Sequence, residues 1–307
     1  MKNKLVIGIP RSFLYYRYGI LWKNFFKKLN CKVIISSETT KKTLEDGKNL
    51  SIDESCLSSK IYMGHIKNLE NKCDYILVPR IGDYGKNNGV CTKFNGIYDV
   101  VKNSFPLINI LDYNIENSKL KFEFFGFFRM GLKITKNIFK ILYSYIYSKK
   151  KQKEYDIEQE NKQINILKSK NKKLLIVSHP YNVYDNLIGV PIIKYLKENN
   201  FEIIYANLYN RKKAILQYKS LSKTLYWLYS KELVGAINYY KDKVDGIIFI
   251  TTFPCGPDSL VNELMIRKLK NIPILNLLID EATSETGLIT RLESFIDIIN
   301  FKGDNNG

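Results

Sequence analysis

The sequence predicts an α/β protein with mostly parallel sheets, arranged as two halves of similar wiring. Short aliphatic runs alternate with segments long enough for helices, this pattern occurs twice, and a strongly basic segment separates the two occurrences. Alternating strands and helices are typical of parallel sheets covered by helices. The chain has 307 residues, of which 45% are hydrophobic, so it is long enough for two domains that each bury a core.

Four runs of aliphatic and β-branched residues predict the strands of the first half. Pro, Gly or charged residues bound each run, and the intervening segments are long enough for helices. The four runs are LVIGI at 5–9, KVIIS at 32–36, DYILV at 74–78 and PLINIL at 106–111.

The second half repeats the first when the sequence is shifted by 170 residues. Pro10 then lies over Pro180 and Gly19 over Gly189, and the predicted helices and strands that follow coincide. Few residues are identical, so the similarity is one of fold. We expect an N-terminal α/β domain at 1–118 and a C-terminal α/β domain at 174–307.

The segment between the halves, residues 119–173, is basic. It has fifteen Lys and Arg against five Asp and Glu, in a chain whose net charge is +18. Arg129, Lys133, Lys136 and Lys140 recur every three or four residues through apolar sequence, which is the pattern of an amphipathic helix. Charge interrupts this sequence well before the ~20 apolar residues of a membrane span. We expect a helical arm or linker, and an acidic partner or an anionic membrane surface as its alternative role.

The basic composition does not indicate a nucleic-acid-binding protein. The sequence contains no zinc-finger spacing, no glycine–aromatic RNA motif and no basic-zipper heptads. The N-terminal sequence MKNKLVIGIPRS lacks the apolar region of a signal peptide. We therefore expect a cytoplasmic location, where thiols stay reduced and cysteine groups serve metals or catalysis more often than disulfides.

The five cysteines fall into two groups. Cys56, Cys91 and Cys255 lie where strands end and helices begin, whereas Cys31 and Cys73 directly precede strands. In open α/β sheets, ligands bind outside the carboxyl ends of the strands. The first three cysteines are therefore candidate ligands, and the other two lie at the opposite edge.

A thiol at the start of a helix is favoured as thiolate by the helix dipole and by the backbone N–H groups. Cys56 follows two acidic residues in the expected first turn of a helix, Cys255 precedes GPDS at the start of another, and Cys91 lies in a glycine-containing loop. Zinc motifs pair ligands two to four residues apart and ferredoxin motifs are equally compact. The spacings of 35 and 164 residues match neither, which leaves a fold-assembled iron–sulfur site or three buried, inert thiols.

Several segments resemble the 2-hydroxyacyl-CoA dehydratase component (D-subunit-like) family, in particular its activase-related branch. The resemblance covers nearly the whole chain. It is carried by GIPRSFLYYRYGILW, DESC, YILVPR, HPYNVYD, KELVGA, PCGPDSLV and DEATSETGLITRLESFID.

This resemblance implies two Rossmann-like domains and an iron–sulfur cluster, commonly [4Fe-4S], held by Cys56, Cys91 and Cys255. It also implies an ATP-dependent activase that injects a low-potential electron, an acyl-CoA substrate that loses water, and a homologous cluster-bearing subunit. The chain departs from the family at Ala282, where a histidine is expected. The activase-related branch has no settled reaction, so whether the chain is an enzyme, such as a lyase, stays open.

Other polar residues lie at the predicted functional edge. His179 ends a strand and is a candidate proton donor or a loop residue, and His65 within a helix is expected to be structural. Glu281 and Glu285 flank the turn into the last helix, where Arg291 would pair with one of them or the group would cap the helix. The alternative function is a cluster-free scaffold that binds CoA or a nucleotide, or a regulatory partner of an activase.

Overall fold

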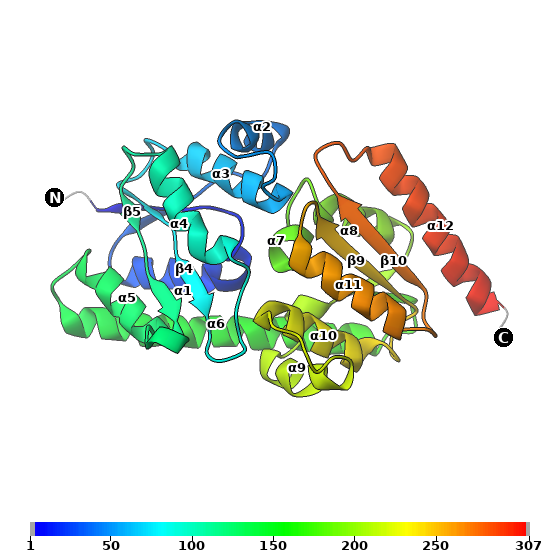
Figure 1. The fold of residues 1–307 in the computed structure, drawn as a ribbon. Helices are drawn as coiled ribbons and strands as arrows, with labels where there is room; N and C mark the ends of the chain where they lie inside the picture. The colour runs from blue at the N-terminus through cyan, green and yellow to red at the C-terminus, as the bar shows by residue number, and fades with distance from the viewer. Residues whose placement is uncertain (1–3, 305–307) are drawn as a thin grey trace. The chain divides into compact units, whose positions relative to one another are not determined.

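The computed structural model describes residues 4–304, which divide into two compact units (Figure 1). Unit 1 comprises residues 1–157 and 226–228, and unit 2 comprises residues 158–225 and 229–307. Each unit contains one four-stranded sheet in which every strand pairing is parallel. The predicted fold class, with two Rossmann-like domains, is confirmed.

The sheet of unit 1 has the strand order β2-β1-β3-β5. Its strands are β1 (Val6–Ile9), β2 (Lys32–Ile35), β3 (Tyr75–Leu77) and β5 (Ile110–Leu111). They lie within the four predicted runs. A second, two-stranded sheet pairs β4 (Arg80–Asp83) with β6 (Asn114–Glu116).

Among the described residues, six α-helices and one 3-10 helix belong to unit 1, and most of the α-helices bury an apolar face. They are α1 (Tyr15–Lys28), α2 (Lys41–Asn49), α3 (Leu57–Leu69), α4 (Lys93–Ser104), η1 (Asn117–Lys119), α5 (Glu123–Leu132) and the first part of α6 (Ile138–Leu167). In α1 the side chains of Leu21, Trp22, Phe25 and Phe26 are almost fully buried. From one turn to the next they are three or four residues apart along the helix, so they lie on one face, which packs against the core of unit 1. The start of α2 is fixed by a capping box between Thr40 and Thr43.

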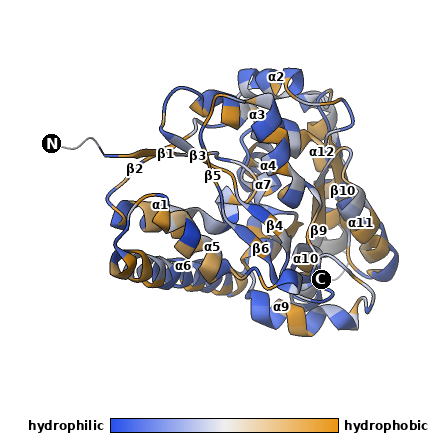
Figure 2. Cartoon of the chain, turned by 60° about the vertical axis from the view of Figure 1, so that its left-hand side comes forward, coloured by the Kyte–Doolittle hydropathy of each residue, from blue (hydrophilic) through white to orange (hydrophobic). Residues whose placement is uncertain are grey.

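The sheet of unit 2 has the order β10-β9-β7-β8. Its strands are β7 (Lys173–Val177), β8 (Glu202–Tyr205), β9 (Gly246–Thr252) and β10 (Ile274–Ile279). Every residue of β7 and β9 is buried, as expected for the two central strands of a covered parallel sheet. The hydropathy colours of Figure 2 show the apolar residues concentrated along β9 and β10.

Helices cover both faces of this second sheet. In Figure 1, α11 lies on one side of it and α8 on the other. The helices are α7 (Pro180–Val183), α8 (Gly189–Glu198), η2 (Ala206–Leu208), α9 (Arg211–Gln217), η3 (Tyr218–Ser220), α10 (Leu228–Tyr240), α11 (Gly256–Lys268) and α12 (Glu285–Asp304).

The two units repeat one topology. In each sheet, counted along the chain, the order is second, first, third and fourth strand. β2 begins at Lys32 and β8 at Glu202, so the predicted shift of 170 residues superposes these strands end to end. The internal repeat is therefore real at the level of the fold.

The basic segment 119–173 is largely helical. It contains α5 and the 30-residue helix α6, which belongs to unit 1 up to Ile157 and to unit 2 from Glu158. Among the described residues, no helix is long and apolar enough to cross a membrane.

Candidate functional site

Cys56 is the N-cap residue of α3. Its side chain is half-buried, and its carbonyl accepts the N–H groups of Ser59 and Lys60 at 2.8 and 3.1 Å. One detail of the prediction was wrong, because the acidic residues Asp53 and Glu54 precede Cys56 in the loop and are not part of the first turn of the helix. The helix α2 lies between β2 and α3. The extended backbone of the cap residue turns the chain from the loop into the helix, so the thiol sits at the positive end of α3.

Two lysines approach the loop that carries Cys56. The Lys60 ammonium is buried under the loop and donates to the carbonyl of Asp53 at 2.9 Å. The Lys93 ammonium reaches from α4 to the hydroxyl of Ser55 at 3.4 Å. Positive charge at this position favours a thiolate over a thiol at Cys56.

Cys91 lies one residue before Thr92, the N-cap of α4, and its carbonyl accepts the N–H of Phe94 at 3.0 Å. The preceding loop contains two glycines at positions that a side chain would disturb. Gly85 has a φ of +115°, and a Cβ on Gly89 would lie 2.3 Å from the ring of Tyr226. The glycines therefore allow a positive φ at Gly85 and the close approach of the Tyr226 ring to Gly89, two residues before Cys91.

Cys255 is the N-cap residue of α11 in unit 2, with a half-buried side chain. Its carbonyl accepts the N–H of Ser259 at 3.1 Å, and Pro257 lies in the first turn, where its missing N–H costs no hydrogen bond. Cys56 and Cys255 thus occupy the same helix position, and Cys91 lies one residue before it.

Cys31 and Cys73 lie before β2 and β3, at the amino ends of the strands, as predicted. Burial raises the pKa of the Cys31 thiol to about 11. Burial also raises the pKa of Cys73, whose thiol donates to the carbonyl of Leu69 at 3.5 Å. Both are protonated packing residues at neutral pH.

The predicted metal ligands are divided between the units: Cys56 and Cys91 belong to unit 1 and Cys255 to unit 2. Among the residues that the structure describes, no three or more His, Cys, Asp or Glu side chains form a group that could hold a metal ion. The thiols fit a cluster in their chemistry and in their place at helix starts. The iron–sulfur cofactor and its three ligands stay a prediction.

His179 forms a buried pair with Asp258. His179 caps α7 at the carboxyl end of β7, and its Nε2 lies 2.9 Å from Oδ1 of Asp258, in the first turn of α11. Both side chains are at most 9% exposed, and the imidazole stacks on Tyr181 at 5.2 Å between ring centroids. A carboxylate oxygen accepts hydrogen bonds, so Nε2–H of His179 donates to Asp258 and the pair fixes the orientation of the imidazole.

Glu281 and Glu285 are exposed, in the turn after β10 and at the start of α12. The turn is held by Asp280, whose Oδ1 accepts the N–H of Ala282 at 3.0 Å. Arg291 does not pair with either glutamate, contrary to one of the two predicted arrangements: its guanidinium donates to the carbonyl of Asn276 at 2.5 Å. The guanidinium thus ties the start of α12 to β10 rather than neutralising a carboxylate.

His65 is fully buried in α3, and both ring nitrogens are bonded. Nδ1 lies 2.9 Å from the Ser36 hydroxyl and Nε2 lies 3.0 Å from the Thr39 hydroxyl. Burial, with a smaller contribution from the Arg11 charge, lowers the pKa of His65 to about 4. The prediction that His65 is structural is confirmed.

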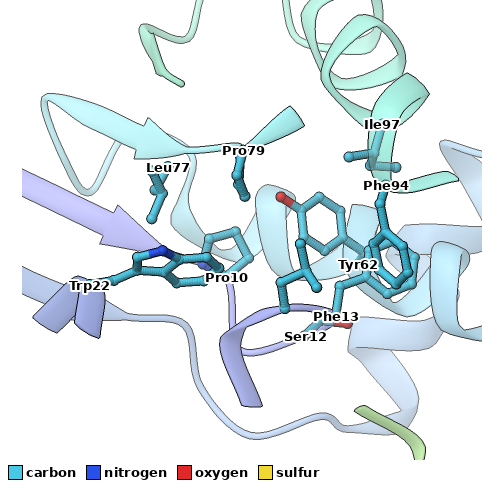
Figure 3. A pocket seen from close by; sticks show the side chains of 10 residues that line it. Pro10, Ser12, Phe13, Trp22, Tyr62, Leu77, Pro79, Phe94 and Ile97 are labelled. Atoms are coloured by element: carbon cyan, nitrogen blue, oxygen red, sulfur yellow. The ribbon is translucent and has the colours of Figure 1, made fainter. Parts of the chain in front are cut away.

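Sequence reasoning missed a small apolar pocket at the carboxyl ends of β1 and β3 (Figure 3). Its lining is aromatic and aliphatic except for Ser12 and the hydroxyl of Tyr62, which points into it beside Pro79. This hydroxyl is buried and has no hydrogen-bond partner among the described residues. The pocket has room for about one water molecule. No sequence signal marks it, because Tyr62 is one of 22 tyrosines.

The fold and these residues define the class of protein: two repeated parallel α/β units with thiols at the starts of strand-following helices. Residues 6–208 match the family described as CoA enzyme activase uncharacterised domain (DUF2229), and the chain belongs to this family. This match confirms the activase-related part of the predicted resemblance. No curated protein sequence matches the chain.

Proposed function

We propose that this activase-related protein holds an iron–sulfur cluster, of the [4Fe-4S] type, through Cys56, Cys91 and Cys255. The observation that carries the proposal is the shared place of these thiols at helix starts. Two are N-cap residues and the third directly precedes one, while the remaining two cysteines lie before strands with raised pKa values.

The chain's own residues stabilise the charged form of the ligands. Cys56 and Cys255 lie at the positive ends of α3 and α11, Cys91 lies just before α4, and the ammonium groups of Lys60 and Lys93 lie by the Cys56 loop. When bound, such a cluster stores and passes on one electron at low potential. His179 and Asp258 add a buried imidazole–carboxylate pair at the first turn of α11, the helix that begins after Cys255, and an imidazole is a common general acid in catalysis.

The partner that fits this role is an ATP-dependent activase-type protein, which the family description supports by naming an activase. The reaction that we assign to the pair is the dehydration of a 2-hydroxyacyl-CoA or a related reduction, with or without a homologous cluster-bearing subunit. We place the pair in the cytoplasm, where thiols stay reduced.

The test is the iron and acid-labile sulfide content of protein prepared without oxygen. We expect about four iron and four sulfide per chain, and their loss in Cys56→Ser, Cys91→Ser and Cys255→Ser. The matched controls are Cys31→Ser and Cys73→Ser, which keep the cluster because their thiols lie at the opposite ends of strands. Equal iron in all five variants, or loss in the controls alone, would contradict the proposal.

A cluster-free scaffold that binds CoA or a nucleotide is the second candidate. It is favoured by the family description, which names a CoA enzyme. The apolar pocket of unit 1 has room for about one water molecule, so such a ligand would bind at another surface of the chain. Colourless protein that stays folded after reconstitution with iron and sulfide, and that binds CoA in calorimetry, would select this reading.

A further inference from the structure

Helix α5 and the first part of α6 expose large apolar side chains to solvent. Phe139 is 84% exposed, Ile146 66%, Tyr143 58% and Phe125 55%. Smaller exposed fractions belong to further apolar residues of the same two helices and the turns beside them: Phe122, Phe124, Leu132 and Ile138. The rings of Phe122 and Phe124 both contact that of Phe125, and Phe124 also contacts Tyr145 of α6. Soluble proteins mostly expose apolar residues singly, whereas a group of neighbouring ones marks an interaction surface.

These residues are on the outer side of helices whose inner side is already packed. Ile141 of α6 is 1% exposed, and Phe127 and Met130 of α5 are fully buried in unit 1. Residues 138–147 are therefore mostly apolar on both sides of α6, and Figure 2 shows hydrophobic and hydrophilic residues mixed along this helix. A helix that is apolar all round is normally covered on all sides.

Basic residues continue the same outer stripe. Phe139, Tyr143, Ile146, Lys150 and Lys153 follow one another at intervals of three or four residues, so they lie along one face of α6. The stripe is thus apolar near the start of the helix and cationic one to two turns further on.

Little acidic charge offsets these lysines. Residues 119–153 contain ten Lys or Arg and a single acidic residue, Glu123. Glu123 is engaged within unit 1, because it accepts hydrogen bonds of 2.8 Å from Lys149 and from the Tyr145 hydroxyl. Arg129, Lys136 and Lys153 form no ion pair with any residue that the structure describes.

We propose that the outer face of α5 and α6 binds the surface of an anionic lipid bilayer, lying in the interface without crossing it. Phe, Tyr and Ile side chains would enter the boundary between headgroups and acyl chains, and the lysines would contact anionic headgroups. A second copy of the chain fits this face poorly, because it would oppose two strongly cationic surfaces. An acidic protein would form ion pairs with the lysines, but its negative charge would not explain why phenylalanine side chains are exposed on the same face.

The experiment is flotation of the full chain with vesicles of phosphatidylcholine alone or mixed with phosphatidylglycerol, at low and high salt. We expect binding to the anionic vesicles only, weakened by salt because the headgroup attraction is screened. Replacing Phe139→Ser together with Ile146→Ser should weaken binding by ~10-fold or more. Replacing Lys150→Gln together with Lys153→Gln should weaken it by several-fold.

Matched controls lie elsewhere on the chain. Leu107 and Leu216 are 94% and 80% exposed, so Leu107→Ser with Leu216→Ser removes equal apolar exposure without touching α5 or α6. Lys194→Gln with Lys197→Gln removes two exposed charges of unit 2. Both controls should bind like the wild type, and circular dichroism should show that all variants are folded.

The variant Phe139→Trp tests directly whether this side chain enters the bilayer. The fluorescence emission of the added tryptophan should shift to shorter wavelength when the protein binds anionic vesicles. The proposal is overturned if no vesicle is bound, or if the control variants lose as much binding as the α6 variants. Retention on polyglutamate with no binding to vesicles would also overturn it, because that result identifies an acidic protein partner. These outcomes are independent of iron content, so they do not depend on the cluster proposed above.

Discussion

The two units share a sheet topology but differ in what lies at the carboxyl ends of their first and third strands. In unit 1 this position holds the apolar pocket between Pro10, Leu77 and Pro79, with the Tyr62 hydroxyl as its isolated polar group. In unit 2 the equivalent position holds a cavity of similar size with a mixed lining, in which Ser178, Thr251 and Asn262 lie among aliphatic side chains. The same sheet topology therefore carries two cavities with different linings at the edge where α/β proteins bind ligands.

Polar groups in the cavity of unit 2 are paired with one another. Asn262 donates to the Thr251 hydroxyl at 2.6 Å, Asn182 donates to the Ser178 hydroxyl at 3.4 Å, and Asp258 holds His179. In unit 1 the residue that aligns with His179 is Ile9, and it is fully buried. Unit 2 therefore has hydrogen-bonded polar groups where unit 1 has apolar surface, so the stability of the two units is expected to respond differently to the same change.

The largest expected loss of stability tests a helix–helix contact that the two units share. In both units the two helices between the second and third strands touch through a glycine: a Cβ on Gly64 would lie 1.8 Å from the Thr43 carbonyl, and one on Gly235 2.1 Å from the Ala214 carbonyl. Because backbone cannot yield as a side chain does, Gly64→Ala and Gly235→Ala should each lower the free energy of unfolding by ~3 kcal/mol or more. Urea unfolding followed by circular dichroism measures this.

Gly96 in α4 is the matched control, because a Cβ added there would meet no atom of a neighbouring element within 4 Å. Gly96→Ala should stabilise the protein by roughly 0.5–1 kcal/mol through the higher helix propensity of alanine. If Gly64→Ala is destabilising and Gly235→Ala is neutral, the helix pairs are not equivalent and the comparison of the units fails at this point.

The next largest effect is a difference between the units in how their stability depends on pH. His65 of unit 1 is bonded only to hydroxyls and its pKa is lowered to about 4, whereas His179 of unit 2 has a carboxylate partner. Since the folded pKa of His65 lies below the unfolded value of 6.5, the unfolded chain binds the proton better. Stability of unit 1 is therefore full above pH 6.5 and should fall by up to about 3 kcal/mol as the pH drops toward 4.

Tryptophan fluorescence reports this loss for unit 1, because Trp22 and Trp227 are the two tryptophans of the chain and both belong to it. The variant His65→Gln removes the titration and should flatten the pH dependence of the fluorescence transition. An equally steep dependence in the variant would assign the effect to other groups, such as Asp83 and Glu116, whose pKa values are lowered by hydrogen bonds and by nearby lysines.

Much of this architecture follows from local sequence. The runs at 5–9, 32–36, 74–78 and 106–111 each contain an observed strand, because aliphatic runs between charged and turn residues have few other places to be buried. The internal repeat could be predicted because its strands are also aliphatic runs, and because β2 and β8 lie 170 residues apart, which is the predicted shift. The helix α2 was missed because KKTLEDGKN is mostly polar, and its contact with α3 depends on Gly47 and Gly64 meeting in space.

The candidate site was less accessible to sequence reasoning. Cysteine positions relative to strands could be read correctly, because the order of elements decides at which end of a strand a residue lies. The pairing of His179 with Asp258 joins residues 79 positions apart, and the Arg291 contact goes to a backbone carbonyl. Such contacts are set by tertiary packing, which no local pattern encodes.

The smallest effect has opposite signs in the two cavities. In unit 1 the Tyr62 hydroxyl loses its hydration on folding and finds no partner among the described residues, so Tyr62→Phe should raise the free energy of unfolding by about 1 kcal/mol. In unit 2 the Ser178 hydroxyl donates to the carbonyl of Ile250 and accepts from Asn182. Ser178→Ala should therefore lower the free energy of unfolding by about 1 kcal/mol.

Both variants remove one oxygen atom from a buried cavity at the same place in the repeat, so each is the control for the other. Urea unfolding by tryptophan fluorescence suits Tyr62→Phe, and circular dichroism suits Ser178→Ala. A loss of stability in Tyr62→Phe would mean that a bound water partners the hydroxyl, since the pocket has room for about one. In that case the two interiors are alike in being hydrogen-bonded, and only the source of the partner differs.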